Sequence, residues 1–494
     1  MNSPDKNILK ELISIDRNSA TAIYLQIAQH IINAIQRGYL LIGSKLPGSR
    51  SLGLLLKNHR NTVTAAYQEL EAQGWIEIHP NKGAFIIEKN KFKRKNTPYP
   101  TLTSLANYPK LTGFKFVRSN ILDQTDQAKS EKIYLTDGST DIRLSNLKTY
   151  ASQYGGLMRR KVSLQTLMHQ QQTGNIFFKE QLSNYLNLSR GLHIGSNNIL
   201  ITRNSEMSFY LINRALICHG DVVVVAHLSR YVVNKTLLDF GARIMTIPID
   251  ENGICVDSLK RILKKQSIRA LYLTPHHHYP TTVTLSAERR VETLHLANTY
   301  GFIIIEDDYD FEFHYEKSAI LPLASADIQG MVIYLGTFGQ SLAPAFQTGF
   351  IIAPPNFIEE LYKHKQIVDP QTDVLMEQTL GEMIQDGEYH RQLKKSLKHY
   401  QQRRNDYAQF IRNVFNHEIS FQIPRGGLAF WLHFERQVAL GKLADLCGQQ
   451  GLYIPRYLLY QNKDIIAMRF GFGHFEEDEI LETLEIMAKS YHKI

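Results

Sequence analysis

Seven short apolar runs, separated by segments with helical spacing, place the strongest constraint on how this 494-residue chain folds. The runs are rich in Val, Ile and Leu and are too short for buried helices. Strands that are apolar on both faces are typical of a parallel sheet covered by helices on each side. The sequence therefore predicts an α/β fold with a mostly parallel central sheet, its strands at 198–202, 222–226, 243–248, 270–274, 302–307, 331–336 and 349–353.

Polar residues follow several of these runs. Sheets of this kind bind ligands at the carboxyl ends of their strands. The sequence therefore predicts a ligand site built from the segments at these ends, namely 204–206, Tyr231, 275–279, 307–309 and 337–341.

The triplet His276–His278 invites a metal-site hypothesis. However, neighbouring side chains on an extended strand end are expected to point in different directions, and no second cluster has metal-ligand spacing. Asp307, Asp308 and Asp310 suggest Mg²⁺, but no phosphate-binding Gly-x-x-x-x-Gly-Lys loop accompanies them. We therefore expect no metal site.

The first 88 residues predict a small domain of a different kind. Apolar residues at helical spacing indicate a helix over about 21–37, a second helix follows Ser49 as a candidate N-cap, and a third begins at Arg60. Two short strands, 75–78 and 84–87, join through a turn at 80–83. Three helices followed by a β-hairpin predict a winged helix-turn-helix domain.

The polar first turn of the third helix is suited to the major groove of DNA. Arg60 matches a guanine edge, Asn61 matches adenine, and Thr62 suits a phosphate or a thymine methyl. Arg50 is expected to face the DNA backbone, and Lys82 on the wing a minor groove or phosphate. The alternative is a small helical domain with a charged surface or a protein-binding winged helix.

Charge supports a polyanionic partner for this domain. The whole chain carries a net charge of +9, and residues 1–97 hold 14 Lys/Arg and 7 Asp/Glu, which leaves the remainder nearly neutral. The alternative is a solvated basic surface. Residues 89–130 combine a basic run with three prolines and are expected to form a linker.

The sequence lacks the features of membrane and secreted proteins, and this predicts its cellular location. No apolar run is long enough to span a membrane, and the N-terminus lacks the apolar core of a secretory signal. Three widely spaced cysteines argue against disulfides and fit a reducing cytoplasm.

The segment from Ile23 to Ile87 resembles the DNA-binding domain of the GntR family of bacterial regulators. The resemblance carries over Arg50, Arg60, Thr62 and Gly83 as family-matched positions. Lys57-Asn58-His59 replaces the family's common Gly-Val-Ser and is expected to alter base preference without altering the fold.

The larger part of the chain resembles fold-type I aminotransferases, and the combination resembles the MocR/PdxR-like regulators. The matching motifs are DGSTDIRL (137–144), GLHIGSNNILITRNSEM (191–207), TPHHHYPTTVTLSAERR (274–290), EDDYDFEF (306–313), YLGTFGQSLAPAFQTGF (334–350) and MRFGFG (468–473). The resemblance implies an aminotransferase-like domain over 131–494 that forms a homodimer, and a site for pyridoxal 5′-phosphate.

The resemblance assigns several residues of that site. Asp307 matches the aspartate on the pyridine nitrogen, and Tyr309 the tyrosine near the ring oxygen. Tyr231 matches the stacking aromatic residue, His277 a ring-contacting residue, and Ser205 a phosphate-binding hydroxyl. Arg469 matches the arginine that receives an amino-acid carboxylate; in this chain it is expected to pair with a side chain such as Glu206 or to bind a carboxylate effector.

Two positions depart from the family in ways that remove its chemistry. Gln340 stands where the family has the Schiff-base lysine, and a carboxamide nitrogen does not form an imine. Gln347 stands where the family has the phosphate arginine. In addition, Glu206 introduces a carboxylate into the phosphate loop, and if its side chain points inward it would repel the cofactor's phosphate.

The sequence therefore predicts a cytoplasmic, dimeric DNA-binding transcription regulator without catalytic residues, whose aminotransferase-like domain serves sensing or dimerisation. Its partners are expected to be operator DNA and a small carboxylate or vitamin B6-type effector, with no membrane. Three alternatives remain open: a regulator that binds pyridoxal phosphate weakly and non-covalently, a body that is only a dimerisation scaffold, and an active aminotransferase.

Overall fold

The computed structural model describes two compact units, Met1–Val117 and Arg118–Ile494. The described residues are 9, 13, 15–17, 19, 21–36, 40, 43–80, 82–87, 111–116, 119–122, 133–145, 147–160, 174–316, 320–338, 348–416, 418–435, 438–462 and 464–494. Most of the segment predicted to be a linker, 89–130, lies outside this part, so the domain boundaries at 88 and 130 stay predictions.

The first unit is a winged helix-turn-helix, as predicted. Its elements are α2 (Ile23–Gln36), α3 (Ser49–Leu55), α4 (Arg60–Ala72), β1 (Ile76–His79) and β2 (Gly83–Ile86). The two strands pair antiparallel. One apolar face of each helix is buried in a common core with the hairpin, and the residues with no exposed surface in that core include Ile27, Ile31, Leu52, Val63 and Leu70.

A backbone angle and a hydrogen bond define the turn between α3 and α4. Lys57 adopts a positive φ of 51°, which turns the chain after α3. The Tyr67 hydroxyl, buried in α4, donates a hydrogen bond of 2.6 Å to the Pro47 carbonyl just before α3. The predicted N-cap Ser49 is wrong by one position, because Gly48 is the N-cap and caps the helix without a side-chain hydrogen bond.

The second unit is built on a seven-stranded sheet of order β4-β12-β11-β10-β9-β5-β6. Only β12 runs antiparallel to its neighbours, so the sheet is mostly parallel, as predicted. The strands are β4 (Ile199–Thr202), β5 (Val222–Ala226), β6 (Arg243–Ile247), β9 (Ala270–Leu273), β10 (Ile303–Asp307), β11 (Val332–Thr337) and β12 (Gly349–Ile352).

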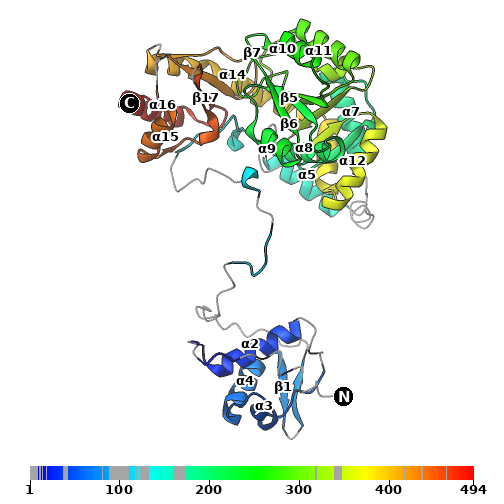
Figure 1. Cartoon of the computed structure of the whole chain (residues 1–494), viewed down its shortest axis with the longest axis vertical. Helices are drawn as coiled ribbons and strands as arrows, with labels where there is room; N and C mark the ends of the chain where they lie inside the picture. Colours follow the sequence, from blue (N-terminus) through cyan, green and yellow to red (C-terminus); the bar gives the residue numbers. More distant parts are fainter. Residues whose placement is uncertain are drawn as a thin grey trace. The chain divides into compact units, whose positions relative to one another are not determined.

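Helices cover both faces of this sheet (Figure 1). Alternate residues of one strand supply the two cores, since Val223 and Val225 of β5 face one layer and Val224 the other. The first layer contains α8 (Ser205–Leu216), α9 (Tyr231–Asp239) and α12 (Pro355–Val368). The second contains α7 (Ile176–Arg190), α10 (Val256–Leu263), α11 (Ala287–Tyr300) and α13 (Val374–Gln385).

A smaller lobe, orange to red in Figure 1, completes the unit. Its sheet has the order β13-β14-β17-β16 and packs with α14 (Glu388–Phe415), α15 (Leu440–Gln449) and α16 (Glu477–Tyr491). Its strands are β13 (Ile419–Ser420), β14 (Ala429–Phe434), β16 (Leu459–Gln461) and β17 (Ile466–Gly471). Among the described residues, no helix combines the length and the apolar character that crossing a membrane requires.

Removal of the Tyr67 hydroxyl is expected to destabilise the first unit. Tyr67→Phe leaves the buried Pro47 carbonyl without its donor, which costs about 1–2 kcal/mol of unfolding free energy. Calorimetry of the full chain should show a lower midpoint for the transition of this unit alone. Tyr24→Phe, at a half-buried tyrosine of α2, is the control, and an equal loss in both variants would contradict the role of the hydrogen bond.

Candidate functional site

The exposed start of α4 carries the residues predicted to read DNA. Arg60 and Asn61 are exposed and Thr62 is half-buried. The His59 side chain caps the helix by accepting a hydrogen bond of 3.3 Å from the Asn61 backbone N–H. Because the cap fixes the first turn, the Arg60 and Asn61 side chains project from a rigid end of the helix.

The other predicted DNA contacts lie on α3 and the wing. Arg50 is exposed in the first turn of α3, and Lys82 is exposed at the tip of the hairpin. Among the described residues, neither side chain forms an ion pair. Gly83 has a φ of +107°, and a Cβ there would lie 2.8 Å from Cε of Lys45, so glycine is the residue that this turn accommodates without strain.

In the second unit, the buried carboxylate of Asp307 stands at the carboxyl end of β10. Its Oδ2 accepts a hydrogen bond of 2.6 Å from the Tyr272 hydroxyl and one of 3.2 Å from Nη1 of Arg230. Burial raises the pKa of Asp307, and the Arg230 charge opposes that shift. Arg230 therefore supplies the positive charge that a buried carboxylate at this position requires.

The same guanidinium also approaches the first turn of α8. Nη2 of Arg230 lies 3.7 Å from Oε1 of Glu206. The Ser205 hydroxyl, predicted to bind phosphate, instead donates a hydrogen bond of 3.3 Å to Oε2 of Glu206. A carboxylate also suits the positive end of the helix dipole. Glu206, whose side chain is 53% exposed, Arg230 and the buried Asp307 thus form a chain of alternating charges within one molecule, here called the internal ion triad.

The internal ion triad does not fit pyridoxal phosphate as the resemblance implies. The phosphate is expected at the start of α8 and the pyridine nitrogen at Asp307. The two ends of the triad hold those positions, and the guanidinium lies between them. A dianionic phosphate next to Glu206 would meet like charge. One oxygen, Oδ1 of Asp307, has no hydrogen-bond partner among the described residues.

Arg469, on β17, is almost fully buried at 2% exposure. Its Nε donates to the Asp137 carbonyl (2.8 Å), its Nη1 to the Pro280 carbonyl (3.0 Å) and its Nη2 to the Tyr309 hydroxyl (3.2 Å). The suggested pairing of Arg469 with Glu206 is wrong, because Glu206 pairs with Arg230 and neutral oxygens satisfy Arg469 instead.

The two predicted tyrosines are held differently. Tyr309 accepts from Arg469 and donates to the His277 carbonyl over 3.3 Å, which joins β17 to the loop after β9. Tyr231 begins α9, is 41% exposed, and stacks on Tyr457 with ring centroids 5.3 Å apart. Tyr309 therefore lies within the polar site, whereas Tyr231 presents much of its ring to solvent.

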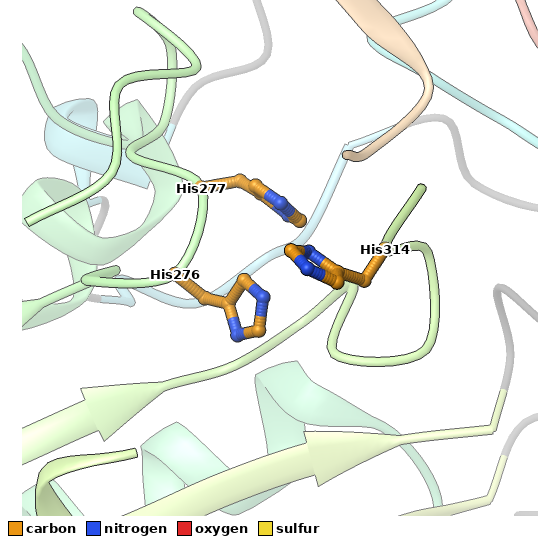
Figure 2. Close-up of side chains that lie close together, drawn as sticks. All are labelled: His276, His277 and His314. Atoms are coloured by element: carbon orange, nitrogen blue, oxygen red, sulfur yellow. The ribbon is translucent and has the colours of Figure 1, made fainter. Parts of the chain in front are cut away.

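Two histidines of the 276–278 triplet lie side by side, although neighbouring side chains were expected to point in different directions. His276 and His277 have ring centroids 4.5 Å apart, because the chain bends at these two residues instead of extending β9. His314, from the loop after β10, joins them (Figure 2). Only His278 turns away, with Nδ1 2.9 Å from the Thr281 hydroxyl.

Gln340 and Gln347 lie outside the described residues, so the two substitutions that most affect cofactor chemistry rest on the sequence. Sequence reasoning missed Arg230, Tyr272 and His314. Arg230 precedes the predicted Tyr231 in the loop after β5. Its position at the carboxyl end of a strand was the one feature of the sequence that could have marked it as a site residue. The contacts of Tyr272 and His314 depend on tertiary packing.

Comparisons with known proteins agree with both units. Residues 23–86 match the family described as bacterial regulatory proteins, gntR family. The chain is 24% identical over 486 residues to YisV, an uncharacterized HTH-type transcriptional regulator of Bacillus subtilis, covering 97% of this chain and 98% of that protein. It is 22% identical over 432 residues to MocR of Rhizobium meliloti, a probable rhizopine catabolism regulatory protein, covering 86% of this chain and 84% of that protein.

The larger unit has a structural counterpart in an aminotransferase. An archaeal alanine:glyoxylate aminotransferase aligns with a TM-score of 0.68 and 25% identity, over 73% of this chain and 91% of its own. The two regulators are therefore similar to this chain along most of its length, and the aminotransferase is similar to its larger unit. Residues 23–86 thus match the GntR family, and the chain along most of its length is similar to MocR-like regulators, with a winged helix-turn-helix domain joined to a fold-type I aminotransferase-like domain.

Proposed function

We propose that this transcription regulator binds operator DNA through α4 and uses its aminotransferase-like domain for sensing and dimerisation, without covalent cofactor chemistry. The observation that carries the proposal is the internal ion triad, in which Arg230 engages both Asp307 and Glu206. Gln340 supports it from the sequence, because the carboxamide at the Schiff-base position does not form an imine.

Two arguments favour a regulator over an aminotransferase. Asp307 and Ser205, which match cofactor-binding residues, bond instead to Arg230 and Glu206, and amides stand at the Schiff-base and phosphate-arginine positions, Gln340 and Gln347. A homodimer, expected from the aminotransferase-like fold, would bring two winged helices to one operator in the reducing cytoplasm. An effector then changes DNA affinity only if it binds one dimer arrangement more tightly than the other.

Reversible, non-covalent binding of pyridoxal phosphate is the second candidate. It is favoured by Oδ1 of Asp307, which lacks a hydrogen-bond partner among the described residues and therefore remains available to a donor. This candidate requires the Arg230 guanidinium, which lies between Asp307 and Glu206, to move aside for the pyridine ring, so it carries the cost of separating a largely buried ion pair. The proposal of a site without bound cofactor avoids that cost.

Arg60→Ala is expected to weaken operator binding by about 1–3 kcal/mol, or about 5- to 150-fold, because a bidentate contact to a base edge is lost. The operator is first selected from random DNA with the full chain, and affinity is then measured by fluorescence anisotropy. Arg159→Ala, at an exposed arginine that ends α5 (Leu147–Arg159) in the second unit, is the control. Unchanged affinity in Arg60→Ala would refute the assignment of α4 as the recognition helix.

The wild-type chain is expected to give no imine absorption band when titrated with pyridoxal phosphate. The double variant Gln340→Lys with Gln347→Arg should gain cofactor affinity and the band. Addition of Arg230→Ala should raise the affinity by a further factor of about 10, because it frees Asp307 for the pyridine nitrogen.

Arg243→Ala in the same double-variant background is the matched control, since Arg243 is exposed on β6. It should leave the affinity unchanged. An imine band in the wild-type chain would overturn the proposal, and equal affinity with or without Arg230 would show that the internal ion triad does not exclude the cofactor.

A further inference from the structure

Three histidines from two loops meet at the junction between the large sheet and the smaller lobe (Figure 2). His276 and His277 follow β9, and His314 follows β10. His314 also forms an isolated antiparallel bridge with Gly426, on the segment that leads into β14. One nitrogen from each of the three rings lies within 4.8 Å of the others.

Two of these rings have buried nitrogens that lack a hydrogen-bond partner among the described residues. His276 and His277 are each only 2% exposed, and Nε2 of both and Nδ1 of His277 are without a hydrogen-bond partner. Buried polar atoms are nearly always satisfied, so three such atoms in one cluster need a physical explanation.

Buried carboxylates stand behind both rings. Oδ1 of Asp310 lies 3.1 Å from Nδ1 of His277, and Oδ1 of Asp308 lies 3.7 Å from Nδ1 of His276. A carboxylate behind an imidazole orients histidine ligands in metal sites once a hydrogen bond joins the two groups. Neither contact is a hydrogen bond here, because Nδ1 of His277 and Oδ1 of both aspartates lack hydrogen-bond partners among the described residues, so the carboxylates stand ready for that role.

The charges of the cluster are also unbalanced. Asp308 pairs with Arg190, but Asp310 is 5% exposed and has only the His277 ring as an ionic partner among the described residues. Neither Asp310 carboxylate oxygen has a hydrogen bond there. The positive charge of Arg469 also acts on Asp310, but without an ion-pair contact among the described residues. A buried carboxylate with so little direct compensation is costly, and a divalent cation on the far side of the ring would add positive charge.

We propose that His276, His277 and His314 bind a divalent transition-metal ion of the kind that prefers imidazole, such as Zn²⁺, with Asp310 and Asp308 as supporting carboxylates. Nitrogens in a tetrahedral zinc site are about 3.4 Å apart, given bonds of 2.0–2.1 Å. The observed limit of 4.8 Å therefore requires side-chain rotations that close at most about 1.4 Å.

Metal binding sets one condition on His276. Nη2 of Arg190 lies 2.7 Å from its Nδ1, so that nitrogen serves as the acceptor in the absence of metal. With metal on Nε2, the proton moves to Nδ1. Nη2 of Arg190 then turns away from this nitrogen and keeps its hydrogen bond to Oδ2 of Asp308, and Oδ1 of Asp308, which has no hydrogen bond among the described residues, becomes the acceptor for the new N–H. The fourth coordination position falls to water or to a ligand.

The test uses the untagged full chain, stripped with a chelator and titrated with Zn²⁺ against a competing indicator. One Zn²⁺ per chain is expected, and X-ray absorption at the zinc edge should show three imidazoles. His314→Phe keeps an aromatic ring at this half-buried position and should lower the affinity by at least about 100-fold, because it removes a direct ligand. Asp310→Asn should lower it by about 10- to 100-fold.

His278→Gln is the matched control, because His278 belongs to the same triplet but its ring faces Thr281. Its affinity should equal that of the wild type. The proposal would be overturned if His314→Phe bound Zn²⁺ as tightly as the wild type, or if wild type, His314→Phe and His278→Gln all bound it equally weakly. An absorption spectrum with fewer than three imidazoles would also overturn it. The cluster would then be a packing arrangement with a His277–Asp310 ion pair. The spectrum of the wild type decides the case if the variants do not fold.

Discussion

The ion pair between Arg230 and Asp307 organises the site of the larger unit. A carboxylate buried at the end of β10 needs a positive partner, and in a pyridoxal-phosphate site the protonated pyridine nitrogen provides it. Here a guanidinium from the loop after β5 does so from within the chain. The positive charge that Asp307 requires therefore comes from the chain itself, and the carboxylate of Glu206 at the start of α8 extends the same charge pattern.

The fold was predictable because its signals are local. The run Val222–Ala226 forms β5 without a shift, and the boundaries of the other six runs differ from the strands by one residue at one or both ends. Apolar periodicity specifies burial directly, so strands and helices follow from it. The cap of α3 was misassigned because Ser49 and Gly48 both suit an N-cap, and the backbone geometry of the turn decides between them.

The site was less predictable because its contacts join distant residues. Asp307 and Tyr309 were recognisable from a motif, but the partner of Asp307 is 77 residues away and that of Tyr309 is 160 residues away. A sequence pattern identifies the charged and polar residues, but it does not show which of their charges neutralise one another in the fold. Arg469 illustrates this, since a buried arginine suggested a carboxylate partner, whereas backbone carbonyls of two loops satisfy it.

The loops after β9 and β10 link the internal ion triad to the histidine cluster. Asp307 ends β10, and the same segment continues through Tyr309 to Asp310 and His314. Tyr309 connects Arg469 to the backbone of His277, whose ring belongs to the cluster. Interiors are close-packed, so a shift of His277 is transmitted to Tyr309 and from there to β17 in the smaller lobe. A ligand bound at either proposed site would contact residues of this junction between the large sheet and the lobe, and it would favour whichever arrangement of the junction it binds more tightly.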